Sequence, residues 1–238
     1  MYQGHYERAA PQFEEGLVAA RKSRDDTSVC SALNTLAILA SNREDYERAE
    51  ALWEEALTLG RKLGDRQRVW SVLVNMGYAR AVRGDYERAE TFLEEVLSLS
   101  KELRDPSATA LALLALGIVA TRQSDHSRAR TLLDEGLMLT RKLGNMVNAA
   151  ESLEALAAVA GALGSHNRAA RLWGAADALR EVTGSPWMPQ ERRLHEPYLT
   201  TARARMDDAG WTKAWEEGRA MPQEDAIASA LEDTEERD

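Results

Sequence analysis

The chain has 238 residues and a formal net charge of −9, with 15 glycines, 6 prolines and a single cysteine, Cys30. Few glycines and prolines among many alanines and leucines favour helix throughout, and one cysteine excludes an internal disulfide framework. Residues 216–238 hold nine acids against two arginines, so the rest of the chain carries only −2. A nearly neutral body with an acidic tail excludes the basic surface that direct binding of DNA or RNA requires.

The sequence also lacks the signals of an exported or membrane-bound protein. The N-terminal stretch MYQGHYERAA has no apolar region of the kind found in signal peptides. The longest apolar stretch, residues 110–120, is too short to cross a bilayer. A single cysteine is typical of a reducing compartment. These features predict a cytoplasmic protein with no membrane partner.

A phrase that recurs every 40 residues organises the chain. It reads GHYERAA at 4–10, REDYERAE at 43–50, RGDYERAE at 83–90, SDHSRAR at 124–130 and GSHNRAA at 164–170. A fixed period of this size is the mark of a repeat architecture. Each unit divides into two predicted helices joined by short loops, so that successive helices are antiparallel neighbours.

Polar residues at fixed places in the repeat predict where the helices begin. Such residues accept hydrogen bonds from the free N–H groups of the first turn. The first helix of each unit is predicted to follow Asp25, Asp65, Asp105 or Asn145, and the second helix Asp45, Asp85, Asp125 or Ser165. The alanine of the repeated phrase, as at Ala89, is small where we expect two helices to cross.

The first predicted helix, residues 5–22, has no preceding partner within the chain, because residues 1–4 align with 41–44. We expect its apolar side chains, Phe13 and Leu17 among them, to be uncovered unless the next repeat packs on them. Terminal repeats normally carry a polar outer face. The sequence therefore predicts a homo-oligomer that forms through this N-terminal helix.

The apolar positions that follow resemble those of the tetratricopeptide repeat family. They read Leu33, Leu36, Ala37, Ala40, Ala49, Trp53 and Ala56 in one unit, and the same faces recur in the next two. The family's unit has about 34 residues, so this 40-residue version has longer helices, and it departs at the tyrosine slot and the closing proline. The resemblance implies an all-α fold, a tetratricopeptide-like solenoid of helical hairpins in a right-handed superhelix with C-terminal capping helices.

We expect three parts along the chain. Residues 1–183 would form the repeats, of which the first is incomplete, residues 184–232 a helical C-terminal cap, and residues 233–238 a frayed acidic tail. Trp187, Trp211 and Trp215 are the large apolar groups of the second part. They can cap the last repeat, or the C-terminal region can fold back into the groove of the solenoid.

The C-terminal region also resembles the distal end of large bacterial LuxR-type and SARP-type regulators, in which a STAND-class ATPase module precedes tetratricopeptide repeats. The match runs through the run RLWGA at 171–175 and through Ala214, Trp215 and the run EGRAM at 217–221. This resemblance implies that the chain belongs to a signal-transducing transcriptional regulator, with the ATPase module as an intramolecular partner.

Recognition in such a stack is expected on the concave wall, which the first helix of each unit forms. The predicted partner-binding residues are Asn34, Ile38, Asn42, Val74, Tyr78, Leu111, Leu114, Ile118, Arg122, Glu151 and Glu154. An apolar middle with polar ends suits an amphipathic helix or an extended peptide laid in a groove. The alternative is that Leu111, Leu114 and Ile118 are core residues of a helix that is apolar nearly all round.

Repeated charged residues are interpreted as structural. The arginines at 8, 48, 88, 128 and 168 are predicted to link adjacent repeats, and the basic pairs at 21–22, 61–62 and 141–142 to complement helix C-termini, with an acidic partner as the alternative for the pairs. Acid pairs such as Glu54 and Glu55 are read as a solvated outer face. His126 and His166 replace the repeat tyrosine.

No motif for catalysis, a cofactor or a metal occurs in the sequence: phosphate loop, dinucleotide fingerprint, zinc-binding helix and nucleophile elbow are all missing. We therefore expect no enzyme, no cofactor and no metal. The predicted function is a protein- or peptide-binding or ligand-sensing module of a bacterial regulator. The alternatives are a free-standing scaffold, or an accessory domain of a multidomain kinase or cyclase.

Overall fold

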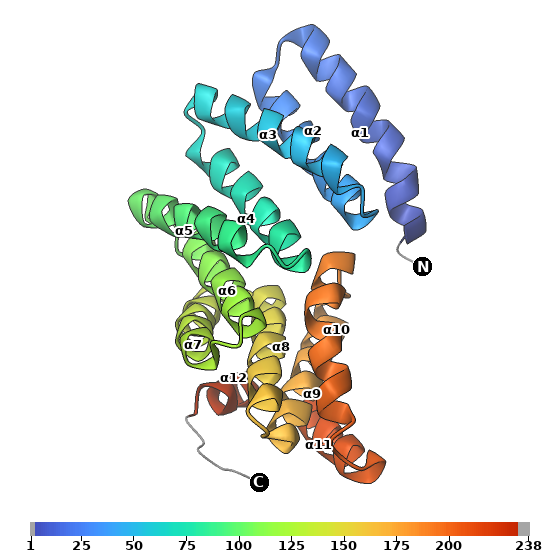
Figure 1. Cartoon of the computed structure of the whole chain (residues 1–238), viewed down its shortest axis with the longest axis vertical. Coiled ribbons are helices and arrows are strands. Elements are labelled where there is room, and N and C mark those ends of the chain that lie inside the picture. Colours follow the sequence, from blue (N-terminus) through green and yellow to red (C-terminus); the bar gives the residue numbers. More distant parts are fainter. Residues whose placement is uncertain (1–2, 233–238) are drawn as a thin grey trace.

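The computed structural model describes residues 3–232, with side chains from residue 10 onward. Within this range all regular elements are helices, twelve in number, with no strand, which confirms the predicted all-α repeat fold (Figure 1). The predicted acidic tail at 233–238 and the side chains of Tyr6 and Arg8 lie outside this range. The helices are α1 (Gln3–Ser23), α2 (Asp26–Asn42), α3 (Tyr46–Leu63), α4 (Arg66–Val82), α5 (Tyr86–Leu103), α6 (Pro106–Arg122), α7 (His126–Leu143), α8 (Met146–Ala162), α9 (His166–Thr183), α10 (Pro189–Arg203), α11 (Asp208–Ala220) and α12 (Gln223–Leu231).

Most of the predicted capping residues make the expected bond. The Asp25 side chain accepts a hydrogen bond from the Ser28 N–H at 3.1 Å, and equivalent bonds close the first turns after Asp45, Asp65, Asp105, Asp125 and Asn145. Asp85 and Ser165 precede their helices as predicted, but neither makes a side-chain capping bond. The Asp85 carboxylate instead accepts a hydrogen bond from Arg80 at 3.1 Å, so the ion pair takes the place of the cap.

The core runs along the crossing points of the helix pairs. Ala49, Ala89, Ala129 and Ala169 are fully buried, which confirms that the small residue of the repeated phrase lies where two helices meet. At Gly117 a Cβ atom would approach the Leu133 side chain to 2.6 Å, so only glycine lets these helices come this close. The core therefore repeats with the same 40-residue period as the sequence.

Ion pairs join the second helices of neighbouring units along the outer side. Arg48 binds Glu14 at 2.6 Å and Arg61 binds Glu95 at 2.7 Å. The prediction that the recurrent arginine links repeats is confirmed at Arg48, and at Arg128, which pairs with a carboxylate of α5. Arg88 forms an ion pair only with the cap of its own helix, within the described residues. These side chains are about half exposed, so each pair contributes at most about 1 kcal/mol.

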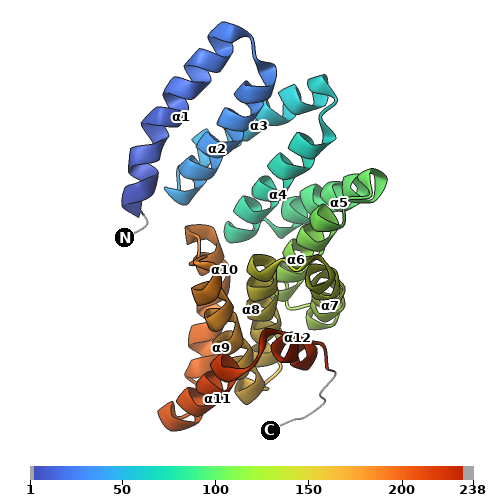
Figure 2. The ribbon, with the colours of Figure 1, turned by 180° about the vertical axis from the view of Figure 1, so that it is seen from behind.

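The first helices of the units, α2, α4, α6 and α8, each pack against the next, which places them on the inner side of the curve. We call this surface the inner wall. In both views α10 lies beside α8, with its first turn toward the ends of α2 and α4 (Figures 1 and 2). The C-terminal region thus returns across the inner wall.

The helices after α10 cover the last repeat. Helix α11 packs on α9, and the two backbones meet at Gly174 and Gly218, where a Cβ atom would collide with the facing backbone. Trp211 is buried in this contact, whereas Trp187 lies between α9 and α10. The tryptophans thus lie at the last repeat, whereas the return of the C-terminal region across the inner wall is made by α10. None of the helices described is long and apolar enough to cross a membrane.

At the N-terminal end, α2 covers part of α1. Leu17 is 8% exposed, so the next repeat does shield it, but Phe13 is 39% and Val18 52% exposed. Phe13 is therefore uncovered as expected, whereas Leu17 is covered by the next repeat, the exception that the expectation allowed. Self-association through this helix stays a prediction.

Candidate binding site on the inner wall

The predicted partner-binding residues are divided between an occupied and an open part of the inner wall. Asn42, Val74, Tyr78, Leu114, Ile118, Glu151 and Glu154 are buried, while Asn34, Ile38, Leu111 and Arg122 are half-buried. The burial of Leu114 and Ile118 matches the alternative that they are core residues. Whether any of the eleven contacts a partner stays a prediction.

Helix α10 is the occupant of one part of the inner wall. Arg193 donates to the backbone oxygen of Asn42 at 3.3 Å, at the end of α2, and forms an ion pair with Glu44 at 2.9 Å. Five residues further along α10, the Tyr198 hydroxyl donates to the Thr121 carbonyl of α6 at 3.2 Å. One helix of the C-terminal region therefore joins the ends of two inner-wall helices that are far apart in the sequence.

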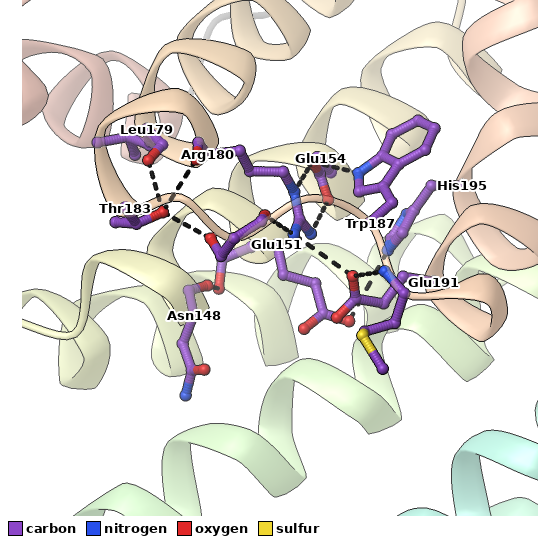
Figure 3. Close-up of polar contacts among 12 residues, drawn as sticks. Asn148, Glu151, Glu154, Leu179, Arg180, Thr183, Trp187, Glu191 and His195 are labelled. Carbon is purple, nitrogen blue, oxygen red and sulfur yellow. Dashed lines mark hydrogen bonds and ion pairs between the residues drawn. The ribbon is translucent and has the colours of Figure 1, made fainter. Parts of the chain in front are cut away.

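A buried ion pair holds the α8, α9 and α10 junction together (Figure 3). The Arg180 guanidinium on α9 donates to both carboxylate oxygens of Glu154 on α8, at 2.6 and 2.8 Å. The indole N–H of Trp187 donates to the same carboxylate at 2.7 Å. The Glu154 side chain is only 2% exposed. Both oxygens of this buried carboxylate therefore have hydrogen-bond donors, which offsets the cost of removing it from water.

Two further carboxylates face the same arginine. Glu151 accepts a hydrogen bond from the Tyr78 hydroxyl at 3.0 Å, and Glu191 on α10 lies 3.3 Å from Arg180. Burial, and then the negative charge of Glu151, raises the pKa of Glu191 from its ordinary 4.5 to about 7, although Arg180 opposes the rise. Burial and the Glu151 charge also raise the pKa of Tyr78 well above 10. Three carboxylates thus share one arginine.

Sequence reasoning placed Glu151 and Glu154 on the inner wall but missed their partners. Arg180, Glu191 and His195 come from α9 and α10, and His195 is buried with its Nε2 atom 3.9 Å from Glu151. One signal was present: two acids three residues apart in the stretch 149–160, whose other residues are all apolar except Ser152. Buried carboxylates need a cation or donors, but the sequence does not say which arginine supplies them.

The open part of the inner wall lies between α2 and α4, where a pocket of about 400 Å³ is lined mostly by polar side chains. The lining residues are Cys30, Ser31, Asn34, Thr35, Asp65, Gln67, Arg68, Trp70 and Ser71. The Asn34 side-chain oxygen accepts hydrogen bonds from Trp53 at 3.0 Å and from Asn75 at 3.1 Å, which fixes its amide. The Trp70 indole N–H is buried and makes no hydrogen bond within the described part of the chain.

The structure offers no site for a metal among the residues it describes, since no group of three or more His, Cys, Asp or Glu side chains converges there. The candidate site instead combines amides, hydroxyls and one indole ring with the Cys30 thiol and the ion pair of Asp65 and Arg68. Such groups bind through hydrogen bonds and stacking.

Comparisons with known proteins agree with the fold. Two family models, both described as tetratricopeptide repeat, match residues 29–64 and 69–142. The crystal structure of BtubC (BKLC) from P. vanneervenii is similar with a TM-score of 0.65 and 18% sequence identity, over 94% of this chain and 89% of that chain. At this identity the likeness concerns the fold alone. No curated protein matches the sequence.

Residues 29–64 and 69–142 thus carry tetratricopeptide repeats, within a helical repeat fold that continues to α9. The resemblance to the ends of bacterial ATPase regulators is tested by none of these matches and stays a prediction.

Proposed function

We propose that this chain is a non-enzymatic protein-interaction module that binds an extended peptide segment in the open pocket between α2 and α4. The observation that carries the proposal is the polar lining of this pocket, which includes the fixed Asn34 amide and Trp70, whose indole N–H makes no hydrogen bond to the described residues. A buried donor without a partner loses the free energy of a hydrogen bond. A peptide carbonyl oxygen would restore that bond if the buried indole N–H turned toward the pocket.

The neighbouring α10 supports the same function from within the chain. It shows that the inner wall accepts a segment that donates to backbone oxygens at the ends of the wall helices, as Arg193 and Tyr198 do. A partner in the open pocket would contact Asn34, whereas Tyr78 and Glu151 lie beneath α10 and would become accessible only if that helix left. We therefore place the peptide site on α2 and α4.

The cellular role that we propose rests on the resemblance of the C-terminal region. Repeats over 1–183 would bind the partner, the cap over 184–232 would cover part of the wall, and the module would act in a bacterial transcriptional regulator, in the cytoplasm. The partner would be a separate protein or an attached ATPase module. A free-standing scaffold and an accessory domain of a kinase or cyclase remain the alternatives, and the coding sequence upstream of Met1 distinguishes all three.

A peptide array followed by affinity measurement tests the site. A peptide selected by the intact chain is labelled, and its dissociation constant is measured by fluorescence anisotropy for Trp70→Phe, which removes the indole N–H together with part of the ring. We expect roughly 3- to 10-fold weaker binding, the effect of one hydrogen bond. Trp173→Phe is the matched control, because that indole is also buried without a hydrogen bond in the described chain but lies on α9. Unchanged binding by Trp70→Phe would place the peptide elsewhere.

A further inference from the structure

A second pocket lies at the other end of the molecule, between α9, α10, α11 and the segment 184–188. It has a volume of about 570 Å³, a size that suits a small organic molecule. Its apolar walls come from Trp173, Trp187, Trp215 and Leu199, and the carboxylates of Asp177 and Glu181 lie at its side. This pocket shares no lining residue with the peptide pocket between α2 and α4.

We propose that this pocket binds a small organic cation with an aromatic or apolar body. The tryptophan rings would hold the body, and Asp177 and Glu181 would hold the charged group. The inference goes beyond the proposed peptide-binding function and does not depend on it.

The aromatic walls form a corner that suits a flat ring. The ring planes of Trp173 and Trp187 make an angle of 72°, and their centroids are 5.9 Å apart. The edge of one ring therefore points at the face of the other. A guanidinium already lies against this corner, because the Arg192 side chain sits 5.4 Å from the Trp187 ring centroid. A cation over an indole face is attracted by the ring's negative charge density. The chain itself thus shows that the Trp187 face accepts a positive group.

The arginines of the pocket are already neutralised. Arg180 donates to both oxygens of Glu154 and to the Ser185 carbonyl at 3.0 Å, and it also faces Glu191. Arg192 is 3.3 Å from Glu196 on its own helix. An anionic ligand would have to compete with these carboxylates, so the pocket disfavours a negative group.

The two carboxylates at the side of the pocket are more accessible to a ligand. Asp177 and Glu181 are one turn apart on α9 and both pair with Arg219 of α11. Their side chains are 47% and 69% exposed, and ion pairs this exposed are weak because water screens the charges. A ligand cation can therefore share or replace Arg219 at little cost. Because two acids share the single arginine Arg219, this side of the pocket carries an excess negative charge, so the pocket selects positive charge.

Three probes with one ring and different charges test the inference: 2-phenylethylamine, which is a cation at neutral pH, the neutral 2-phenylethanol, and the phenylacetate anion. Binding to the full chain is followed by NMR through the indole N–H signals of its six tryptophans. We expect the signals of Trp173, Trp187 and Trp215 to shift, with the amine binding about fivefold more tightly than the alcohol, as for one exposed ion pair, and phenylacetate binding most weakly.

Two sets of variants locate the charge selection. Asp177→Asn with Glu181→Gln should weaken binding of the amine to the level of the alcohol and leave the alcohol unchanged, whereas Trp187→Leu should weaken both. Glu54→Gln with Glu55→Gln is the control, because it changes the net charge equally on the remote helix α3.

Several outcomes would overturn the proposal. They are no binding by any of the three probes, equal binding of amine and phenylacetate, an amine affinity that survives Asp177→Asn with Glu181→Gln, and indole shifts confined to Trp53 and Trp70. The peptide assay with Trp70→Phe is separate from these measurements, so failure here leaves the proposed peptide site untouched.

Discussion

Replacing Glu191 by glutamine should make the docking of α10 less dependent on pH. Glu191 is at the start of α10, its side chain is 16% exposed, and it accepts a hydrogen bond from the Met188 N–H at 2.9 Å. A glutamine oxygen can accept the same bond, so the substitution removes mainly the negative charge. The charged and titratable groups that face Glu191 are Tyr78 of α4, Glu151 and Glu154 of α8, Arg180 of α9 and His195 of α10.

The magnitude follows from the raised pKa of Glu191, which is about 7 in the folded chain against an ordinary 4.5. Between these two values the folded state binds more protons than the unfolded state, so stability falls as pH rises through this window. Each pH unit corresponds to about 1.4 kcal/mol, which gives a loss of about 3 kcal/mol for the wild-type side chain between pH 4.5 and pH 7. Glutamine, which does not titrate, avoids this loss.

We therefore expect Glu191→Gln to match the wild type near pH 5 and to exceed its free energy of unfolding by up to about 3 kcal/mol at pH 8. Urea denaturation of both proteins at pH 5 and pH 8 measures the two free energies of unfolding. Subtracting the wild-type value from the variant value at each pH removes the contribution of the titrating groups that the two proteins share. Hydrogen exchange of the α10 amides, compared at equal pH, reports whether the gain is local to this helix.

The control is Glu196→Gln on the same helix, where half of the side chain is in water, and we expect no change in the pH dependence. A stability difference between wild type and Glu191→Gln that is the same at pH 5 and pH 8 would refute the reasoning. A variant less stable than wild type at pH 8 would show that the bond to Arg180 outweighs burial.

Three further predictions concern packing, the buried ion pair and association. Gly174→Ala should lower the free energy of unfolding by about 2–3 kcal/mol, because its Cβ atom would collide with the backbone of α11. Gly16→Ala, on an exposed helix face with open space around it, should raise that free energy by about 0.5–1 kcal/mol. Thermal denaturation of the two variants measures the difference. Arg180→Ala should lower the free energy of unfolding by about 3–5 kcal/mol, because it leaves the Glu154 carboxylate buried without its partner. Replacing both Arg180 and Glu154 by leucine should recover most of this stability. A double variant as unstable as Arg180→Ala would contradict the explanation. The molar mass in light scattering should rise with protein concentration and stay monomeric for Phe13→Glu, while a wild-type mass independent of concentration would exclude association through α1.

The repeats could be predicted from the sequence because their interactions are local and recur. A capping residue such as Asp125 bonds to a backbone N–H three residues later, and the alanine at a crossing point, such as Ala129, packs within its own pair and the next. The same constraint therefore leaves the same residue type every 40 positions. Departures arise where a longer-range charge competes, as at Asp85, which binds Arg80 in place of capping its helix.

The path of the C-terminal region could not be predicted, because its contacts occur once and join distant parts of the chain. Arg193 meets Asn42 across 151 positions, and Tyr78 meets Glu151 across 73. No period connects such pairs. The sequence showed two acids in an apolar helix, which requires a buried partner, but arginines are frequent in the chain and nothing in their spacing singles out Arg180.

The polar contacts of α10 have a consequence that apolar packing alone would not have. Buried Leu194 and Ala202 would fit several positions along the inner wall with similar free energies, because dispersion and apolar burial have little directionality. The polar contacts, by contrast, are directional: Glu191 must face Arg180, and Arg193 must reach the carbonyl at the end of α2. A shift of α10 by one residue along the wall would rotate both side chains away from their partners by about 100°. Buried charge therefore fixes the register of α10, and this register leaves the α2 and α4 pocket open while the neighbouring wall is covered. A partner that enters that pocket consequently meets a wall whose second half is already occupied by a helix held in one place.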